Sequence, residues 1–168
     1  MGFKNRYYGT KKVEYEGIVF DSTPERDAYR ILREAEKRGL ISDLKLKEVF
    51  TLIPRQTEAV EVKMKTKTKI VQAFREHPLT YESDFTYYQG GKKIVLDIKG
   101  QFITEDYVIR RKLMRWQGNP ITECRDPHAL FPEIADEFGI PTAKQRKKKV
   151  KITEDKPKDR FESPGLFE

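Results

Sequence analysis

Three ionisable residues stand inside otherwise apolar, strand-like segments, and their types suit divalent-metal chemistry. Asp84 precedes a run of aromatic residues, while Asp97 and Lys99 are two positions apart in Val-Leu-Asp-Ile-Lys. Side chains alternate along a strand, so Asp97 and Lys99 share a face, with the Lys99 ammonium roughly 7 Å along the strand from Asp97. Burying such charges costs free energy unless they are paired or bind a metal. Carboxylate oxygens suit Mg²⁺, which keeps several waters and takes further ligands from phosphate.

A plainer interpretation stays open for the same residues, because an isolated Asp-x-Lys pattern is usually an ordinary solvated strand face. The segment 81–101 is nevertheless organised as a hairpin, since Gly90 and Gly91 can adopt the positive φ of a tight turn. Alternation then predicts two faces for its first strand. One carries Tyr81, Ser83, Phe85 and Tyr87, and the other carries Glu82, Asp84 and Thr86.

A third acidic residue, Glu25, begins a predicted helix that ends at Gly39. With Ser22 as the N-cap, Glu25 completes a Ser-x-x-Glu capping box, which alone explains its presence. Glu25 also starts the stripe that faces the core, which continues through Ala28, Tyr29, Leu32 and Ala35. Capping and catalysis are therefore both open for this carboxylate.

The remaining elements are predicted from periodicity and from turn residues. We expect a short hairpin or a bent strand at 13–20, a strand near 48–53 after a turn at 42–43, a last strand at 121–124 and a short helix at 132–138. A helix at 105–117, capped by Thr104, places Ile109, Leu113 and Trp116 at core spacing. The basic residues of that helix, Arg110 and Lys112 among them, are candidates for binding phosphate, and a solvated helix face is the alternative.

The segment 58–74 alternates apolar or threonine residues with charged ones. As one extended segment it would carry a lysine ladder on one face, with Lys63, Lys65 and Lys67 as candidate DNA contacts, because each lysine on a phosphate releases counterions. Equally, the lysines suit an edge strand that must resist aggregation. We expect an inserted arm at about 54–78.

Charge and composition bound the function. The chain of 168 residues has 34 Lys and Arg against 27 Asp and Glu, a net charge of +7 that favours an anionic partner. It has no apolar run of membrane-spanning length, and one cysteine, Cys124, excludes an internal disulfide. We therefore expect no membrane association and a cytoplasmic location. The organisation expected is one domain over residues 1–142 and a charged, disordered tail over 143–168.

The order of these elements resembles the PD-(D/E)XK nuclease superfamily, and more narrowly the small phage endonucleases related to endonuclease I Holliday junction resolvases. The matching segments cover roughly residues 7–124. They are Tyr15 to Ser22 followed by Glu25 and Tyr29, Leu79 to Phe85, Val95-Leu-Asp-Ile-Lys-Gly100, and Thr104 to Leu113. Two features depart from the pattern: Asp97 stands where many relatives have Glu, and no proline precedes Asp84.

The resemblance implies an α/β fold of restriction-endonuclease type, with a four-stranded mixed sheet flanked by helices. By position, Asp84 and Asp97 would bind Mg²⁺, for which Mn²⁺ substitutes, and Glu25 would be the third acid. The carbonyl of Ile98 would complete the metal shell. Lys99 would orient or help to deprotonate the attacking water.

The function implied is a Mg²⁺-dependent, structure-selective DNA endonuclease, a phage Holliday junction resolvase acting on branched or four-way DNA. Paired incisions would need two active sites, and hence a homodimer, in the host cytoplasm if the protein is phage-encoded. Two alternatives remain: another PD-(D/E)XK DNA nuclease, nicking or cleaving transposon ends, and a non-catalytic DNA-binding protein.

Overall fold

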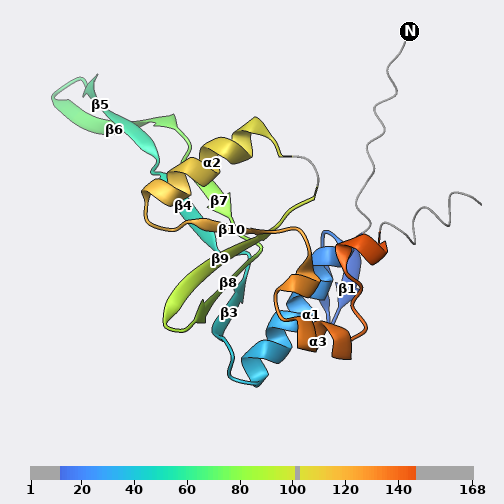
Figure 1. Cartoon of the computed structure of the whole chain (residues 1–168). Helices are drawn as coiled ribbons and strands as arrows, with labels where there is room; N and C mark the ends of the chain where they lie inside the picture. The colour runs from blue at the N-terminus through green and yellow to red at the C-terminus, as the bar shows by residue number, and fades with distance from the viewer. Residues whose placement is uncertain (1–11, 101–102, 147–168) are drawn as a thin grey trace, which may run out of the picture.

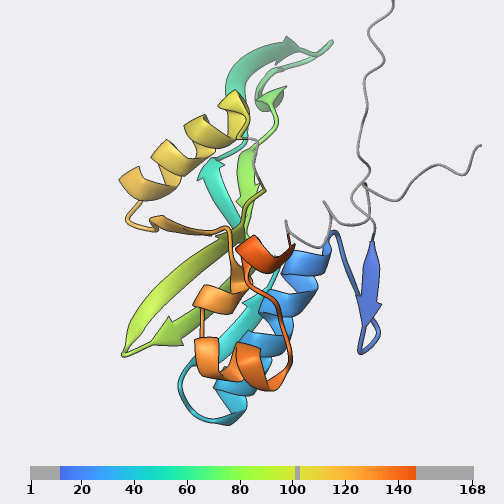
Figure 2. The same cartoon turned by 45° about the vertical axis from the view of Figure 1, so that its right-hand side comes forward.

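The protein is described from a computed structural model that covers residues 12–100 and 103–146 (Figure 1). Two helical layers enclose a central sheet, and a hairpin arm projects from one end (Figures 1 and 2). The helices are α1 (Thr23–Lys37), α2 (Glu105–Trp116), α3 (Pro132–Glu137) and the 3-10 turn η1 (Pro127–Ala129). The strands are β1 (Val13–Tyr15), β2 (Ile18–Phe20), β3 (Ser42–Leu46), β4 (Val49–Ile53), β5 (Gln56–Lys63), β6 (Thr68–Glu76), β7 (Leu79–Glu82), β8 (Phe85–Gln89), β9 (Lys92–Ile98) and β10 (Ile121–Cys124).

The central sheet has four strands in the order β10-β9-β8-β3. β10 runs parallel to β9, whereas β8 is antiparallel to both β9 and β3, so the sheet is mixed. The β8–β9 hairpin turns at Gly90 and Gly91, whose φ angles of 57° and 77° are positive. The predicted α/β class, mixed four-stranded sheet and glycine turn are therefore confirmed. Strand β3 is a correction, because the sequence predicted only a turn at 42–43.

The predicted first strand of the hairpin is broken at Ser83 and Asp84. β7 precedes the break and pairs with β4, while β8 follows it and joins the central sheet. Tyr81 consequently packs in a different core from Phe85 and Tyr87, and the prediction that they share a face is wrong. The break lies where Ser83 donates through its N–H and its hydroxyl to the carbonyl of Glu48.

The larger core lies between the sheet and α1, with α3 beside α1 (Figure 2). The apolar stripe of α1 is fully buried as predicted, at Ala28, Tyr29, Leu32 and Ala35. These side chains pack with Phe85 and Leu96 from the sheet. Since both α1 and the sheet contribute closely packed residues, the beginning of α1 is held at a fixed distance from the end of β9.

The smaller core lies on the opposite face of the sheet, beneath α2. Tyr107 and Met114 are its buried helix residues, and Leu113 packs against them. The predicted stripe was wrong at two positions, because Ile109 is exposed and Trp116 is 81% exposed. Helical spacing allows either a stripe through Ile109 and Trp116 or one through Tyr107 and Met114 to face the sheet. In the structure Tyr107 and Met114 are the buried pair, because they pack against residues of β4, β7 and β9.

The predicted insertion is a two-stranded arm, β5 paired with β6, that shares no ladder with the central sheet. Its chain reverses near Lys65, so the lysines do not line one face of a single strand. Lys63 pairs with Thr68 and Val62 with Lys69, which places Lys63 and Lys69 on opposite faces of the hairpin. The single-faced lysine ladder is thus corrected to a lysine-rich tip.

The start of the predicted tail has structure: residues 143–146 are helical, and Arg146 donates to Asp27 at 2.9 Å. The rest of that prediction, from residue 147, lies outside the described residues. Within the described chain, no helix has the length and apolarity needed to cross a membrane. Cys124 is buried in the larger core as a free thiol.

Candidate active site

Glu25 caps its own helix and also faces the end of the sheet. Its N–H donates to the hydroxyl of Ser22, the N-cap, and that hydroxyl contacts Glu25 Oε1 at 3.0 Å. The other oxygen, Oε2, accepts from the N–H of Asp21 at 3.2 Å. The predicted capping box is therefore confirmed. Because the side chain is largely buried at the start of the core-facing stripe, capping has fixed this carboxylate in place without turning it towards solvent.

Asp84 lies in the break between β7 and β8 and is held from two sides. Its Oδ2 accepts from the N–H of Ile98 on β9 at 2.7 Å. Its Oδ1 contacts the ammonium of Lys47 at 3.0 Å. The Ile98 carbonyl was the predicted metal ligand, but the contact seen is through its amide, which fixes the orientation of the Asp84 carboxylate.

Glu48 stabilises the break that presents Asp84. Its carboxylate binds the Lys93 ammonium at 2.7 Å through Oε1 and the Thr86 hydroxyl at 2.5 Å through Oε2, while its carbonyl accepts from Ser83. These two side-chain hydrogen bonds hold the pKa of Glu48 below its usual range. Glu48 immediately precedes β4, so these contacts tie the start of β4 to β8 and β9 beside the break, and the position of the Asp84 carboxylate depends on the fold around it.

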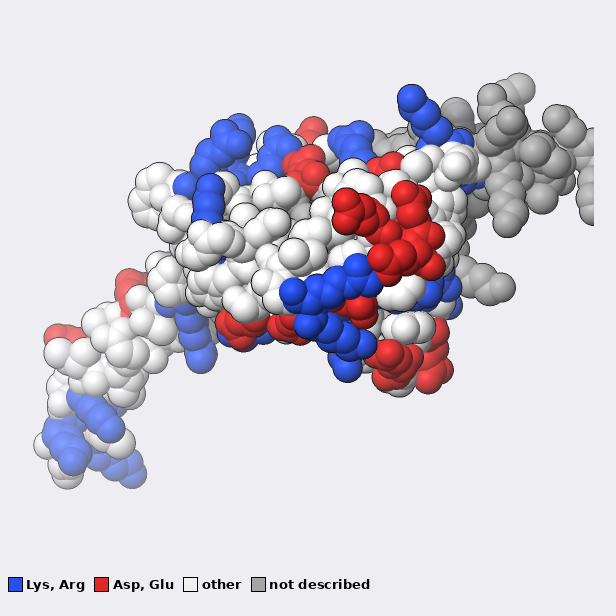
Figure 3. All heavy atoms as spheres, turned by 60° about the horizontal axis from the view of Figure 1, so that its bottom comes forward, with Lys and Arg blue, Asp and Glu red and all other residues white. Residues whose placement is uncertain are grey.

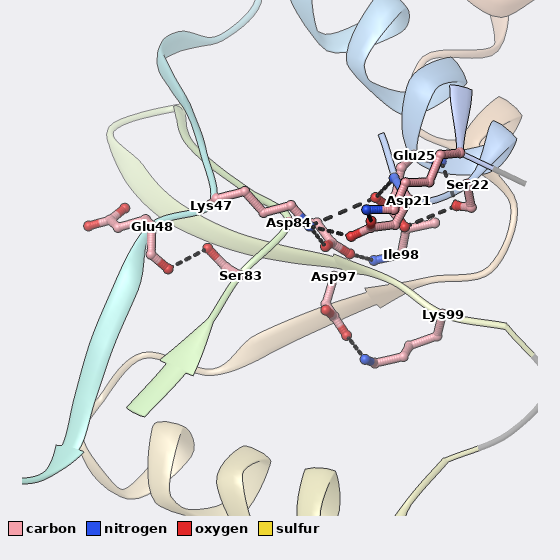
Figure 4. A network of polar contacts seen from close by, with 11 residues as sticks. Asp21, Ser22, Glu25, Lys47, Glu48, Ser83, Asp84, Asp97, Ile98 and Lys99 are labelled. Carbon is pink, nitrogen blue, oxygen red and sulfur yellow. Dashed lines mark hydrogen bonds and ion pairs between the residues drawn. The ribbon is translucent and has the colours of Figure 1, made fainter. Parts of the chain in front are cut away.

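Lys47 is the site residue that the sequence did not reveal. It lies between β3 and β4 with a φ of 53°, and its ammonium is 3.7 Å from Asp21 Oδ2, 3.8 Å from Glu25 Oε2 and 3.0 Å from Asp84 Oδ1 (Figure 4). Burial alone would lower the pKa of Lys47, but the hydrogen bond with Asp84 and the neighbouring carboxylates outweigh it and raise the pKa. A lone lysine between two short strands gives no sequence signal of this kind.

Asp97 and Lys99 form a close pair on the α2 side of β9. The Lys99 ammonium lies 2.5 Å from Asp97 Oδ2 and 3.8 Å from the centre of the Tyr107 ring. The prediction of a shared face is confirmed, but the separation of about 7 Å is not, because the lysine side chain folds back over Tyr107. Within the described part of the chain, Asp97 Oδ2 is buried without a hydrogen bond of good geometry.

The three predicted acids are electrically linked although they do not form one ligand set. Asp97 points towards Lys99, whereas Glu25 and Asp84 gather around Lys47 (Figure 4). Burial raises the pKa of Glu25, and the charge of Asp84 raises it further. Burial likewise raises the pKa of Asp97, with Lys99 opposing and Asp84 adding to the shift. Over residues 12–100 and 103–146, no three acidic, histidine or cysteine side chains converge tightly enough to hold a metal ion.

Two hollows meet at Glu25. One of about 120 Å³ includes Lys47 and Asp84 in its wall, and one of about 300 Å³ includes Ile98 and Lys99. The carboxylates of Glu25 and Asp84 line the smaller hollow and those of Asp21 and Glu25 line the larger one, and carboxylate oxygens are donors that Mg²⁺ prefers. The donor chemistry therefore fits a hard divalent cation.

The predicted basic surface of α2 is partly neutralised. Arg110 pairs with Asp106 at 2.9 Å, and Arg111 pairs with Glu123 at 2.5 Å. Lys112 lines a hollow of about 430 Å³ between α2 and β10, together with Arg111 and Arg115. Of the two predicted contact residues on this helix, Lys112 thus faces an open basic hollow, while Arg110 is engaged within its helix.

Comparison with models of protein families assigns the chain to a family. The model of the family described as "Protein of unknown function (DUF1064)" matches residues 5–134, more than half of the chain. The chain belongs to the DUF1064 family. No curated protein and no solved structure matches it. The matched region contains Glu25, Lys47, Asp84, Asp97 and Lys99, so the DUF1064 match spans every element that builds the candidate site.

Proposed function

We propose that this DUF1064 protein is a Mg²⁺-dependent DNA endonuclease with a restriction-endonuclease-like core of the PD-(D/E)XK type. The observation that carries the proposal is that three largely buried carboxylates from separate elements lie near one end of the sheet, where the charge of Asp84 raises the pKa of both Glu25 and Asp97. Glu25, Asp84 and Asp97 have side chains only 12%, 14% and 5% exposed. Concentrating like charges there is costly unless a cation offsets them.

Each residue has a distinct role in this proposal. Asp84 and Asp97 would bind the metal, and Glu25 would supply the third carboxylate. Mn²⁺ should substitute, since it accepts the same oxygen ligands. A bound divalent cation would offset the negative charge that develops on the phosphodiester during attack by water.

Lys99 acts on the attacking water. Its ammonium lies over the Tyr107 ring and beside Asp97, so the charge is held close to that carboxylate. From there the ammonium can donate a hydrogen bond to the water or to a nonbridging phosphate oxygen. Because Asp84 and Lys99 both depend on the end of β9, the strand fixes their separation, as a catalytic pair requires.

The proposed substrate is branched DNA, most simply a four-way junction, cut by a homodimer in the host cytoplasm. This part of the proposal rests on the resemblance to phage junction resolvases. The net charge of +7 supports a polyanionic substrate, and contacts to the backbone allow a protein to select shape over base sequence.

The first test compares a labelled four-way junction with a linear duplex of the same sequence, in Mg²⁺ and in EDTA, with the wild type and Asp97→Ala. We expect symmetric cuts in the junction that need Mg²⁺ and are lost in the variant. Cleavage of both DNAs would favour another PD-(D/E)XK nuclease, and cleavage that persists in EDTA or in Asp97→Ala would contradict the proposed site.

A non-catalytic DNA-binding protein is the second candidate, favoured by one observation. Lys47 lies within 4 Å of three carboxylates, so part of the acidic cluster is already neutralised by the chain itself. In that case the junction would bind without being cut in either Mg²⁺ or Mn²⁺. Binding without cleavage would therefore indicate that the acidic cluster stabilises the fold and does not act in catalysis.

A further inference from the structure

The β5–β6 arm is the most exposed part of the described chain. Its two strands pair only with each other, and every residue from 61 to 70 is exposed. In Figure 3 the arm extends from the body and its end is covered by Lys and Arg side chains. An isolated two-stranded hairpin gains little stability by itself. A protein that keeps such an arm exposed is expected to use it for contact with a partner.

Charge is strongly divided along the arm. Lys63, Lys65, Lys67 and Lys69 all lie at its tip, and no acidic residue occurs between positions 62 and 72. Two acidic residues of the arm, Glu58 and Glu76, lie towards its base, where Glu58 pairs with Arg75, and the third, Glu61, lies two residues before Lys63. The partner of the tip is therefore a polyanion. A second copy of the arm would bring lysine against lysine and is disfavoured.

The lysines point to both sides of the hairpin, which restricts how a polyanion can be bound. Lys63 and Lys69 lie on opposite faces, and the N–H of Met64 closes the turn on the carbonyl of Lys67 at 2.8 Å. A hairpin lying flat on a phosphate backbone would use one face and leave the other lysines in water. A hairpin standing in a groove has a row of phosphates on each side.

We propose that the arm tip inserts into the major groove of duplex DNA flanking the cleavage site, with lysines from both faces on the two phosphate backbones. The major groove is about 12 Å wide and admits a two-stranded β-ribbon, whereas the minor groove at about 6 Å does not. Exposed apolar side chains at the tip, Val62, Met64 and Ile70, would contact the groove floor, where thymine presents a methyl group.

The arm also sets the length of DNA that the protein covers. β4 leads from the acidic site to the base of the arm, and β5 leads from there to the tip. Thirteen strand residues span at most about 43 Å. The contact thus lies no farther than little more than one helical turn of duplex from the cut, since one turn is about 34–36 Å. This inference rests on the proposed function in taking DNA as the substrate.

The test measures binding in EDTA, where cleavage plays no part, on a linear duplex and on a four-way junction with arms of about two helical turns. The variant Lys65→Ala/Lys67→Ala removes charge only from the turn. The matched control, Lys37→Ala/Lys92→Ala, removes two exposed lysines from the body. We expect the tip variant to bind about tenfold more weakly and its logarithmic salt slope to be smaller by about 1.8, with no such change in the control.

Methylation by dimethyl sulfate locates the contact, because guanine N7 lies in the major groove. The wild type and the control should protect N7 within about one turn of the junction, and the tip variant should lose that protection. Unchanged affinity and salt slope in the tip variant, or protection confined to the minor groove, would overturn the groove proposal. A protein that shows the tip-dependent footprint but cuts nothing in Mg²⁺ or Mn²⁺ would keep the arm proposal and remove the proposed nuclease function.

Discussion

The acidic site and the arm are both charged regions, but they hold their charges in opposite ways. At the site, Glu25, Asp84 and Asp97 are largely buried and are fixed by hydrogen bonds or ion pairs from several elements. At the arm tip, the lysines are exposed and supported only by the pairing of β5 with β6. Chemistry on a reacting atom needs fixed geometry, whereas affinity for a polyanion needs only charge of the right sign. The difference assigns catalysis to the site and binding to the arm.

The largest expected effect is at Lys99. Lys99→Met keeps an apolar side chain near Tyr107 but removes the ammonium, and we expect single-turnover cleavage of a junction to fall by about 10²- to 10⁴-fold. Binding in EDTA should change by less than about twofold, because Lys99 is one charge among many on the substrate path. If only binding were lost, Lys99 would have a binding role like that of the arm lysines, which would contradict the assignment of catalysis to the acidic site.

The two regions should also differ in what their apolar residues contribute to stability. Leu96→Ala opens a cavity in the larger core and should lower the free energy of unfolding by about 2–5 kcal/mol. Val62→Ala on the exposed arm should change it by less than about 0.5 kcal/mol. Urea denaturation of both variants measures this, and a large loss from Val62→Ala would show that the arm packs on something in solution.

Lys47 tests whether the acidic cluster needs a cation. Lys47→Met removes the ammonium shared by three carboxylates, and because this side chain is 40% exposed we expect a loss of only about 1 kcal/mol in EDTA. Mg²⁺ should then raise the melting temperature of the variant more than that of the wild type. Equal responses to Mg²⁺ in the two proteins would contradict a metal site beside Lys47.

The smallest effect is a pH dependence at Glu48. Its pKa is depressed in the folded protein, so the pairing stabilises the fold above the unfolded pKa of about 4.3 and is lost as the pH falls through the lower folded value. Glu48→Gln should therefore cost about 0.5–1 kcal/mol at pH 7 and progressively less as the medium is acidified. A stability difference that is constant from pH 7 to pH 3 would contradict this ionic contribution.

The sequence predicted those features of the site that depend on residues close together in the chain, but not the contacts between residues far apart in the chain. The capping box at Ser22 and Glu25, the Gly90–Gly91 turn and the alternation of Asp97 with Lys99 are short-range features, and the structure has each of them. Lys47 is different, because its role depends on β3 and β4 bringing it to carboxylates far away in the chain. The periodicity of the sequence gives no information on contacts between residues that are far apart in the chain.

The other misses have related causes. The break at Ser83 arises from hydrogen bonds with Glu48, 35 residues earlier, which no alternation pattern records. Trp116 fits a helical stripe as well as Met114 does, and only packing against the sheet distinguishes the two rotations. In the arm, the alternation was real, but the reversal of the chain placed Lys63 and Lys69, the first and last lysines of the pattern, on opposite faces.

The most direct test of the central claim is Asp84→Asn, assayed for junction binding and for cleavage on the same sample. The substitution keeps an oxygen for the Ile98 amide and removes only the charge. We predict binding within about twofold of the wild type and cleavage in Mg²⁺ reduced by about a thousandfold or more, since metal stabilisation of the reacting phosphate contributes several kcal/mol. Weaker binding with unchanged activity in the bound fraction would contradict the role of Asp84 and, with it, the metal-dependent site.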